Sequence, residues 1–599
     1  MRMQAATSAL EMVARAAFML LAACLPFELV TPIARVGPLA LTSVELALYV
    51  ALGAGAAALT ARALSVPCGV AVRLPRLTAL DVAVGAFAVV LLVSAARAPL
   101  LRGTAFKFAL RTMGGMAVYF VAARVLRRRG AVLAVAGSLT AGAVVAALLL
   151  VWDRHSPAAA DALLPFHFAF DVFGLPRASG PFQYPNIAAM YLEAAVPVAL
   201  AVGAALDARR GGHRVAIAAA AIALLLGRSV SLTESRAGVM TVGVVLAGMA
   251  LFAGRARPTV RRQAIAVLTG LMILAVAGSS QSTQRFKFWL DQVWYKSAIR
   301  PAPGGTGVPA TLAPEELAVV AIEVRNLGAR AWPATGAQPI RLSYHWQEAE
   351  TGRTVVFDGL RTLLPSDVAP GATARLAARV QAPDRAGRYR LRFDLVHEGV
   401  TWFSRRGDAG YDAAVEVAET ADARPPRVDD VVASGSEAAA AADGAAREVS
   451  RPRLWRGALA AFEEHPLLGL GPDNFRHAYN RYVGLAEGAA FDDRLHANNW
   501  FFETLATLGL AGVAALFVVV GLVWRSARRA LTRHERSSPE GLLAFGLSAA
   551  LSAYAIHGLF DYFLEFTPTY AMLWLLAGLL AALAEGSDPS RRDYSPVEQ

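Results

Sequence analysis

Residues 131–152 read AVLAVAGSLTAGAVVAALLLVW, an apolar run without one Asp, Glu, Lys or Arg. A helix needs about 20 apolar residues to cross the hydrocarbon core of a bilayer, so this run predicts a transmembrane helix. Similar windows raise the prediction to about twelve spans, the others lying at 10–26, 38–60, 78–96, 106–126, 186–206, 214–232, 237–254, 262–280, 504–524, 541–562 and 568–585. The predicted fold class is an all-α polytopic membrane protein.

The composition supports this class. Of the 599 residues, 56% are hydrophobic and 17% are charged, whereas about 25% of an average soluble protein is charged. An ordinary cytosolic enzyme and a largely disordered chain are therefore excluded. The two cysteines, Cys24 in an apolar run and Cys68 in a loop, exclude a disulfide framework and a cysteine-based metal site.

The basic residues predict the orientation in the membrane. The net charge is +12, and arginines gather in alternate short loops, at 124–129, 209–214, 255–262 and 525–536. Because such loops stay in the cytoplasm, both termini are predicted to be cytoplasmic and the long segment 281–503 to lie outside. The loops account for most of the basic excess, so a nucleic-acid partner is excluded.

The middle of the outer segment is not membrane-like. The stretches 320–325, 340–347 (IRLSYHWQ) and 389–395 (YRLRFDL) alternate apolar and polar residues, and turn signals such as Pro370-Gly371 separate them. Short alternating strands with intervening turns predict a β-sandwich over 310–420. It resembles the small immunoglobulin-like modules of cell-surface and carbohydrate-active proteins, although a sandwich by itself names no function.

The chain is therefore divided into seven parts. They are an N-terminal membrane part of about nine spans (1–280), a periplasmic connector (281–309), the sandwich (310–420), a flexible linker rich in Ala and charged residues (421–452), a periplasmic helical part (453–503), a C-terminal membrane part of about three spans (504–585) and a cytoplasmic tail (586–599).

Two polar segments flank spans in the N-terminal half. The first, SLTESRAG at 231–238, places Arg236 on the side that the charge rule disfavours. Arg236 is either a snorkelling residue or an ion-pair partner of Glu234, or a cation for an anionic lipid headgroup, because guanidinium binds phosphate bidentately. The second, RASGPFQYPN at 177–186, contains turn residues and ends at Asn186, a suitable helix N-cap.

Two further segments lie ahead of the tenth span. HPLLGLGPDNF at 465–475 is either an anion-binding Gly-rich turn or a tight turn beside an outer amphipathic helix. No Lys-Ser/Thr follows it, so a nucleotide P-loop is not supported. In HANNW at 496–500, a helix would place His496, Asn499, Trp500 and Glu503 on one face.

His496 at the outer interface suits a proton acceptor, or it is an interfacial polar residue beside an aromatic belt. A weaker feature is His557 with Asp561 at i+4 near the outer end of the eleventh span. Ionisable residues at membrane depth favour a functional role, and a structural His–Asp hydrogen bond is the alternative.

In this order the segments resemble the motifs of the bacterial O-antigen ligase and polymerase family. Residues 177–186 are similar to its Arg-x-x-Gly-x-Phe-x-x-Pro-Asn, 231–238 to its Thr/Ser-x-Ser-Arg-Gly/Ala, and 465–475 to its Pro-Leu-x-Gly-x-Gly-x-x-Asn-Phe. The family's His-Asn, nine residues, then Gly is matched in spacing by 498–499 and Gly509. Relatives often read His-Ala-His-Asn, so Asn498 replaces a histidine here and the identity of the base stays open.

The resemblance implies a glycosyltransferase in the bacterial inner membrane, with the large loop in the periplasm. Such an enzyme moves a glycan from a polyprenyl-diphosphate carrier to a hydroxyl of lipid A–core, in ligases, or of another carrier-linked glycan, in polymerases. His496 is the candidate base and Arg236 the catalytic cation. Candidate substrate-binding residues are Arg228, Arg177, Asn186, Asn498, Asn499, His557 and Asp561.

Membrane lipids are the remaining expected partners, and no cofactor is expected. No metal is expected either, because Asp492-Asp493 is the only tight acidic pair near the site and no ligand set accompanies it. A lipid-linked glycan transporter is the main alternative, but nine spans before the loop and three after it form a poor symmetric pair. A glycan-binding membrane anchor would leave His496 and the outer arginines unexplained. Ligase, polymerase and glycan-to-protein transferase stay open.

Overall fold

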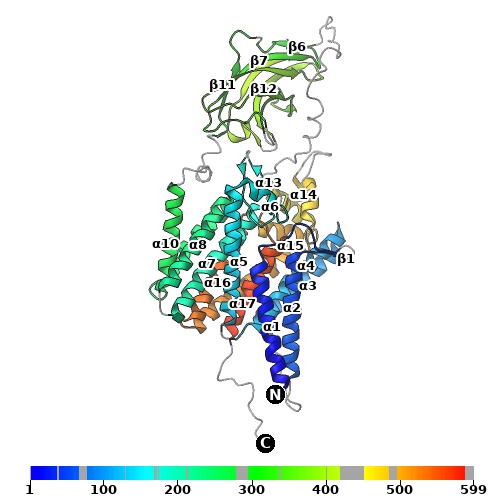
Figure 1. Ribbon diagram of the computed structural model, residues 1–599. Coiled ribbons are helices and arrows are strands. Elements are labelled where there is room, and N and C mark those ends of the chain that lie inside the picture. Colours follow the sequence, from blue (N-terminus) through cyan, green and yellow to red (C-terminus); the bar gives the residue numbers. More distant parts are fainter. Residues whose placement is uncertain are drawn as a thin grey trace.

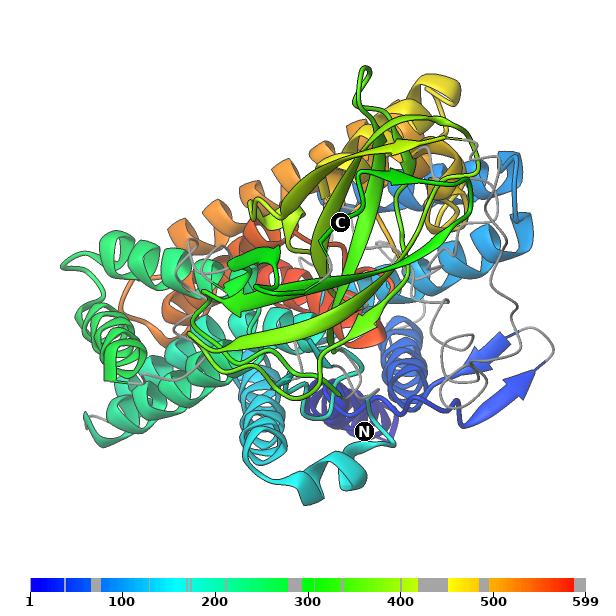
Figure 2. The same ribbon diagram turned by 90° about the horizontal axis from the view of Figure 1, so that it is seen from above.

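The computed structural model describes thirteen stretches of the chain: 2–36, 39–65, 77–128, 130–167, 171–172, 175–210, 213–277, 294–305, 307–335, 339–398, 401–418, 451–483 and 495–586. They form a helical bundle and a separate sheet-rich part beyond one end of it, here termed the outer end (Figure 1; Figure 2 shows the sheets from above). Cys68, Asp492-Asp493 and nearly all of the predicted linker 421–452 lie outside the described residues.

Every predicted span coincides with a long helix. These are α1 (Arg2–Cys24), α2 (Ser43–Leu64), α3 (Ala79–Arg97), α4 (Arg102–Val125), α5 (Ala131–His155), α7 (Pro185–Arg210), α8 (His213–Leu232), α9 (Arg236–Ala253), α10 (Pro258–Ala277), α15 (Trp500–Arg533), α16 (Pro539–His557) and α17 (Thr567–Glu585). Within the described stretches, ten of them are long and apolar enough to cross a membrane, and α4 and α10 are not among the ten. The count of twelve therefore stays a prediction.

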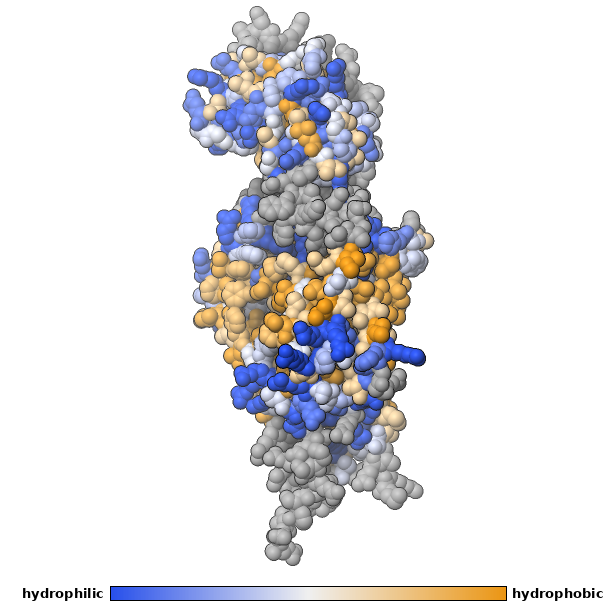
Figure 3. All heavy atoms as spheres, turned by 90° about the vertical axis from the view of Figure 1, so that its left-hand side faces the viewer, coloured by the Kyte–Doolittle hydropathy of each residue, from blue (hydrophilic) through white to orange (hydrophobic). Residues whose placement is uncertain are grey.

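The bundle is organised around two buried helices. The apolar window of α7 is entirely buried and that of α17 nearly so. Helix α7 packs against α8 and α16, and α17 packs against α4. The outer helices instead expose apolar side chains such as Leu251 and Phe252. Figure 3 shows an apolar band across one face of the bundle, with hydrophilic residues toward its two ends. This distribution is that of a multi-pass membrane protein.

The sheet-rich part consists of two sheets around one core. The strands are β5 (Ser297–Pro301), β6 (Thr311–Leu312), β7 (Leu317–Asn326), β8 (Ile340–Glu348), β9 (Thr354–Val356), β10 (Thr362–Leu363), β11 (Thr373–Gln381), β12 (Gly387–His397), β13 (Thr401–Trp402) and β14 (Tyr411–Val417). One sheet has the order β10-β8-β12-β14-β6, with β9 beside β8 and β13 beside β12, and the other has the order β11-β7-β5. Trp332, Trp346 and Phe393 are buried in the shared core.

The predicted alternating strands are confirmed, but one boundary is wrong. Strand β5 lies inside the predicted connector 281–309, but it belongs to the sheet, because its residues pair antiparallel with β7. The sheet-rich part therefore starts before residue 310. Its immunoglobulin-like character stays a prediction.

Smaller elements lie near the bundle. They are the hairpins β1 (Ala34–Val36) with β2 (Leu39–Leu41) and β3 (Asp171–Val172) with β4 (Leu175–Pro176), the short helix α6 (Pro157–Leu163), and the amphipathic helices α13 (Arg451–Glu464) and α14 (Phe475–Val483). Helices α13 and α14 pack on each other and on the first turns of α15 around Leu454 and Phe475. The predicted helical part at 453–503 thus contains α14, most of α13 and the start of α15, and α13 begins two residues earlier, in the predicted linker.

Candidate active site

A break in α15 brings two of the sequence motifs into contact. Gly509 has φ 60° and ψ −157°, so the helix is interrupted there. The 465–471 loop fills the interruption, because the Leu510 amide donates to the Pro466 carbonyl at 2.8 Å and two amides of the loop donate to carbonyls of α15 at 2.9 Å. These hydrogen bonds give partners to backbone groups that the break leaves unpaired within the helix.

The glycines of this contact leave no room for a side chain. A Cβ on Gly469 would lie 2.3 Å from the carbonyl carbon of Thr507, and a Cβ on Gly509 would lie 2.6 Å from that of Leu467. Both glycines have positive φ, where a side chain is strained. The amides of 469–471 already donate to backbone carbonyls. The structure thus favours the tight turn over the anion-binding turn.

His496 lies directly ahead of α15 and is buried, with 4% of its surface exposed. Its Nδ1 lies 3.1 Å from Oε1 of Glu503, and its Nε2 lies 2.9 Å from Oε2 of Glu565. The condition for a shared helix face is not met, because α15 begins at Trp500 with Asn499 as its N-cap. His496 meets Glu503 across the cap rather than along a helix face.

The two asparagines after His496 have structural roles. Asn499 accepts the Phe502 amide at 3.0 Å and donates to the Leu559 carbonyl at 2.7 Å, so it caps α15. Asn498 has φ 48°, in the left-handed region that asparagine tolerates better than most residues. A contact of either residue with substrate stays a prediction.

Three carboxylates surround the imidazole of His496. Besides Glu503 and Glu565, Oδ1 of Asp473 lies 3.9 Å from Nε2. Burial lowers the pKa of His496, but the charges of Glu503 and Glu565 outweigh burial and raise this pKa well above its ordinary value. Burial raises the pKa of Asp473 despite Arg476, which donates two hydrogen bonds of 2.8 Å to that carboxylate. The raised pKa favours the imidazolium form of His496 at neutral pH.

The segment 558–566, between α16 and α17, joins this cluster to the second motif. Tyr562 packs against His496 with 4.8 Å between ring centroids. Asp561, one residue earlier, accepts a hydrogen bond from Nδ2 of Asn186 at 2.9 Å. The candidate site residues Asn186 and His496, which are more than 300 residues apart in sequence, thus both contact this short segment.

Arg177 extends this hydrogen-bond network toward the first motif, at 231–238. Its Nη2 donates to Oδ1 of Asn186 and its Nε donates to the Thr233 carbonyl, both at 2.9 Å. The structure therefore brings together Arg177, Asn186 and Asp561, and fixes them to the turn that precedes α9.

His557 pairs with a residue that the sequence analysis did not identify. Its Nδ1 lies 2.9 Å from Oε1 of Glu193, and both side chains are buried. The predicted pairing with Asp561 is wrong, because the Asp561 carboxylate instead bonds to Asn186. A Cβ on Gly238 would lie 2.9 Å from Cβ of Ala189 and 3.0 Å from Cγ1 of Val230, so this glycine of the first motif allows α9 to pack closely against α7 and α8.

The two remaining predicted cations flank the same turn. Arg236 is the first residue of α9 and is exposed. Arg228, in the last turns of α8, donates to Oγ of Ser231 at 3.0 Å. Glu234 between them is buried and has φ 58°. A role of these arginines toward a diphosphate stays a prediction.

Beside the His496 cluster lies a second ionic group that the sequence analysis missed. Arg111 of α4 donates to Glu45 at 2.7 Å and to Oγ1 of Thr567 at 3.0 Å. Glu28 is buried nearby and lies 3.5 Å from the amide nitrogen of Gln183 in the second motif. One sequence signal could have identified these ionisable residues, namely a charged side chain inside or beside an apolar window. It applies to Glu28, Glu45, Arg111, Glu193 and Glu565.

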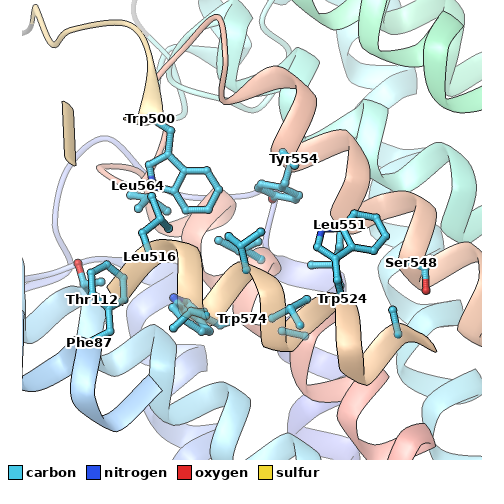
Figure 4. Close-up of a pocket in the computed structure, with 17 residues that line it drawn as sticks. Phe87, Thr112, Trp500, Leu516, Trp524, Ser548, Leu551, Tyr554, Leu564 and Trp574 are labelled. Carbon is cyan, nitrogen blue, oxygen red and sulfur yellow. The ribbon is translucent and has the colours of Figure 1, made fainter. Parts of the chain in front are cut away.

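An apolar groove runs alongside the polar cluster between α3, α4, α15, α16 and α17. Its cavity is about 60 Å³, and Trp500, Leu516, Trp524, Leu564 and Trp574 are among its lining residues (Figure 4). Trp500 follows the His496 loop and Leu564 precedes Glu565 in the chain. Two of its lining residues are therefore close in sequence to residues of the cluster.

Within the described stretches, no three His, Cys, Asp or Glu side chains are arranged to hold a metal ion. The acidic pair Asp492-Asp493 lies outside those stretches. Metal independence stays a prediction.

The fold and the site define a class of protein, which is a multi-pass membrane bundle with a buried acid–base cluster at one end. Residues 415–517 match the model of the O-antigen ligase family (Wzy_C), which supports this family for the chain. The segments 177–186 and 231–238 lie outside the match, so their resemblance stays a prediction. The matched segment includes the 465–475 loop, His496 and Gly509.

The other comparisons add nothing to the family match. No curated protein matches the chain. Among solved structures, the Pseudomonas fluorescens alkylpurine DNA glycosylase AlkC, bound to DNA containing an abasic site analog, is matched over 57% of this chain and 97% of that chain, with 10% identity and a TM-score of 0.15. At this TM-score the likeness says nothing about the fold or the function of this chain.

Proposed function

We propose that this protein is an O-antigen ligase-like glycosyltransferase of the bacterial inner membrane. It transfers a glycan from a polyprenyl-diphosphate carrier to an acceptor hydroxyl of lipid A–core at the periplasmic face. The observation that carries this proposal is the buried cluster around His496 at the outer end of an apolar bundle. His496, Glu503 and Asp473 lie within the family match, and Glu565 lies beyond it.

The surroundings of the cluster fit a substrate with a lipid tail and a polar head. The groove lined by Trp500 and Leu564 offers apolar side chains to a lipid chain. Arg177, Arg228 and Arg236 offer guanidinium groups at the outer ends of the helices, and guanidinium matches the geometry of phosphate oxygens. The polar head would lie between these arginines and the His496 cluster.

The chemistry needs two kinds of group. A base must take the proton of the acceptor hydroxyl, and cations must stabilise the diphosphate as the glycosidic bond breaks. The cluster supplies acid–base groups and the arginines supply cations. No nucleotide is required, because the carrier diphosphate is itself the leaving group.

A glycan profile of cells that lack the protein tests the proposal. A ligase predicts lipid A–core without long glycan chains while carrier-linked polymer accumulates. A polymerase, which uses the same donor, predicts lipid A–core that bears single repeat units. Loss of long chains with carrier-linked glycan retained on the cytoplasmic side would indicate a transporter, and an unchanged profile would also contradict the proposal.

A further inference from the structure

The two ring nitrogens of His496 both face carboxylate oxygens. Nδ1 lies 3.1 Å from Glu503 and Nε2 lies 2.9 Å from Glu565. An ionised carboxylate can only accept hydrogen bonds. A ring nitrogen 2.9 Å from a carboxylate oxygen therefore needs a proton between the two atoms, because two acceptor lone pairs would repel at this distance. The Nδ1 proton is directed at Glu503, so a second proton must lie between Nε2 and Glu565. The acceptor position of His496 is therefore already filled.

Access to the substrate differs sharply among the groups of this cluster. The side chains of His496, Glu503 and Asp473 are 5%, 1% and 6% exposed, whereas that of Glu565 is 24% exposed. The second oxygen of Glu503 accepts the Ala497 amide at 2.8 Å. Glu565 is thus the carboxylate of the cluster with both an oxygen unused by His496 and a route to the outside.

We propose, on the basis of the proposed function, that Glu565 is the catalytic residue that accepts the proton, and that His496 is a positioning residue which holds it as an imidazolium. In the reaction, the acceptor oxygen forms a bond to the anomeric carbon, and the bond from that carbon to the diphosphate breaks. The electron pair of the broken bond leaves with the diphosphate, and the hydroxyl proton passes to Oε1 of Glu565.

The neighbours of Glu565 are compatible with this role. Arg476 of α14 lies 3.9 Å from Oε1, Arg111 of α4 also faces the carboxylate, and Asp473 and Tyr562 complete its ionisable surroundings. Burial raises the pKa of Glu565, but His496, Arg476 and Arg111 outweigh it and hold the pKa below its ordinary value. The carboxylate is therefore ionised and ready to accept a proton at neutral pH.

The test compares the pH dependence of kcat for three purified full-length proteins, using a polyprenyl-diphosphate-linked oligosaccharide as donor. Glu565→Gln removes the acceptor and should lower kcat by about 10²–10⁴-fold at every pH, with KM for the donor little changed. His496→Gln keeps a neutral hydrogen-bonding group beside Glu565. Loss of the imidazolium raises the pKa of Glu565. The pH below which kcat falls should therefore increase by roughly 1–3 units, and activity should return at high pH.

Several outcomes would overturn the assignment. An inactive His496→Gln at every pH, or an unchanged kcat in Glu565→Gln, would contradict it. Glu464→Gln is the matched control, since Glu464 lies at the end of α13 and bonds to Arg481 and Tyr482 outside the cluster. If Glu565→Gln does not fold, Glu565→Asp replaces it, with a reduced kcat expected and an unchanged kcat contradicting the assignment. Absence of transfer by the wild-type protein would instead contradict the proposed function.

Discussion

Arg177 and Arg236 are both arginines at the outer end of the bundle, but their surroundings differ. Arg177 is half-buried and donates to the Thr233 carbonyl and to Asn186, whereas Arg236 is exposed. Because a buried hydrogen bond to a charged group contributes about 1.5–3 kcal/mol, Arg177→Ala should lower both Tm and transfer. Arg236→Ala should lower Tm less than Arg177→Ala does and reduce donor affinity and turnover. Thermal melting and donor-concentration dependence measure the two effects.

Lysine and alanine substitutions separate a diphosphate role of Arg236 from a structural one. Arg236→Lys should impair transfer clearly, because lysine lacks the planar fork that binds two phosphate oxygens. A mild Arg236→Lys together with a severely impaired Glu234→Ala would indicate that Arg236 only supports the turn.

At the scale of the element, the break in α15 depends on one glycine. Gly509→Ala places a Cβ against Leu467 at positive φ, and strain at such a position costs about 1–3 kcal/mol before the clash is counted. Gly521 lies in the same helix with nothing within 4 Å of its Cβ position, so Gly521→Ala should be neutral or stabilise by about 0.5–1 kcal/mol. Melting of both purified variants tests this, and equal Tm values would show that the 465–471 loop does not depend on the break.

The helices were predictable and the break was not, for one physical reason. An apolar window identifies a span because the bilayer requires it, and the run after residue 503 stays apolar through Gly509. The interruption is stabilised by the 465–471 loop, whose partners are set by tertiary contact. For the same reason the sequence indicated His496 but not Glu565, which lies 69 residues away in the chain.

At the scale of the molecule, the sandwich has a core of its own. All residues of that core lie between 294 and 417. Replacing 294–418 with a flexible linker should therefore leave the bundle folded and reduce acceptor use without abolishing transfer. Detergent-solubilised yield, melting and the transfer rate measure the outcome, and an unfolded bundle would show that the sandwich is required for its stability.

The predicted orientation is tested by cysteine labelling in intact cells. With Cys24 and Cys68 replaced by serine, Glu350→Cys in the sandwich should react with an impermeant reagent, because residue 350 is exposed. Arg529→Cys near the other end of α15, also exposed, should react only after the membrane is permeabilised. Labelling of position 529 in intact cells would reverse the orientation and place the His496 cluster in the cytoplasm.

Glycosyl transfer at the outer-end cluster is the central claim, and product analysis tests it most directly. The purified protein is incubated with a polyprenyl-diphosphate-linked glycan and lipid A–core, and the products are identified by mass spectrometry. The wild-type protein should yield glycosylated lipid A–core and free polyprenyl diphosphate, and Glu565→Gln should yield neither at a comparable rate. Undiminished donor and unmodified acceptor with the folded wild-type protein would contradict the claim.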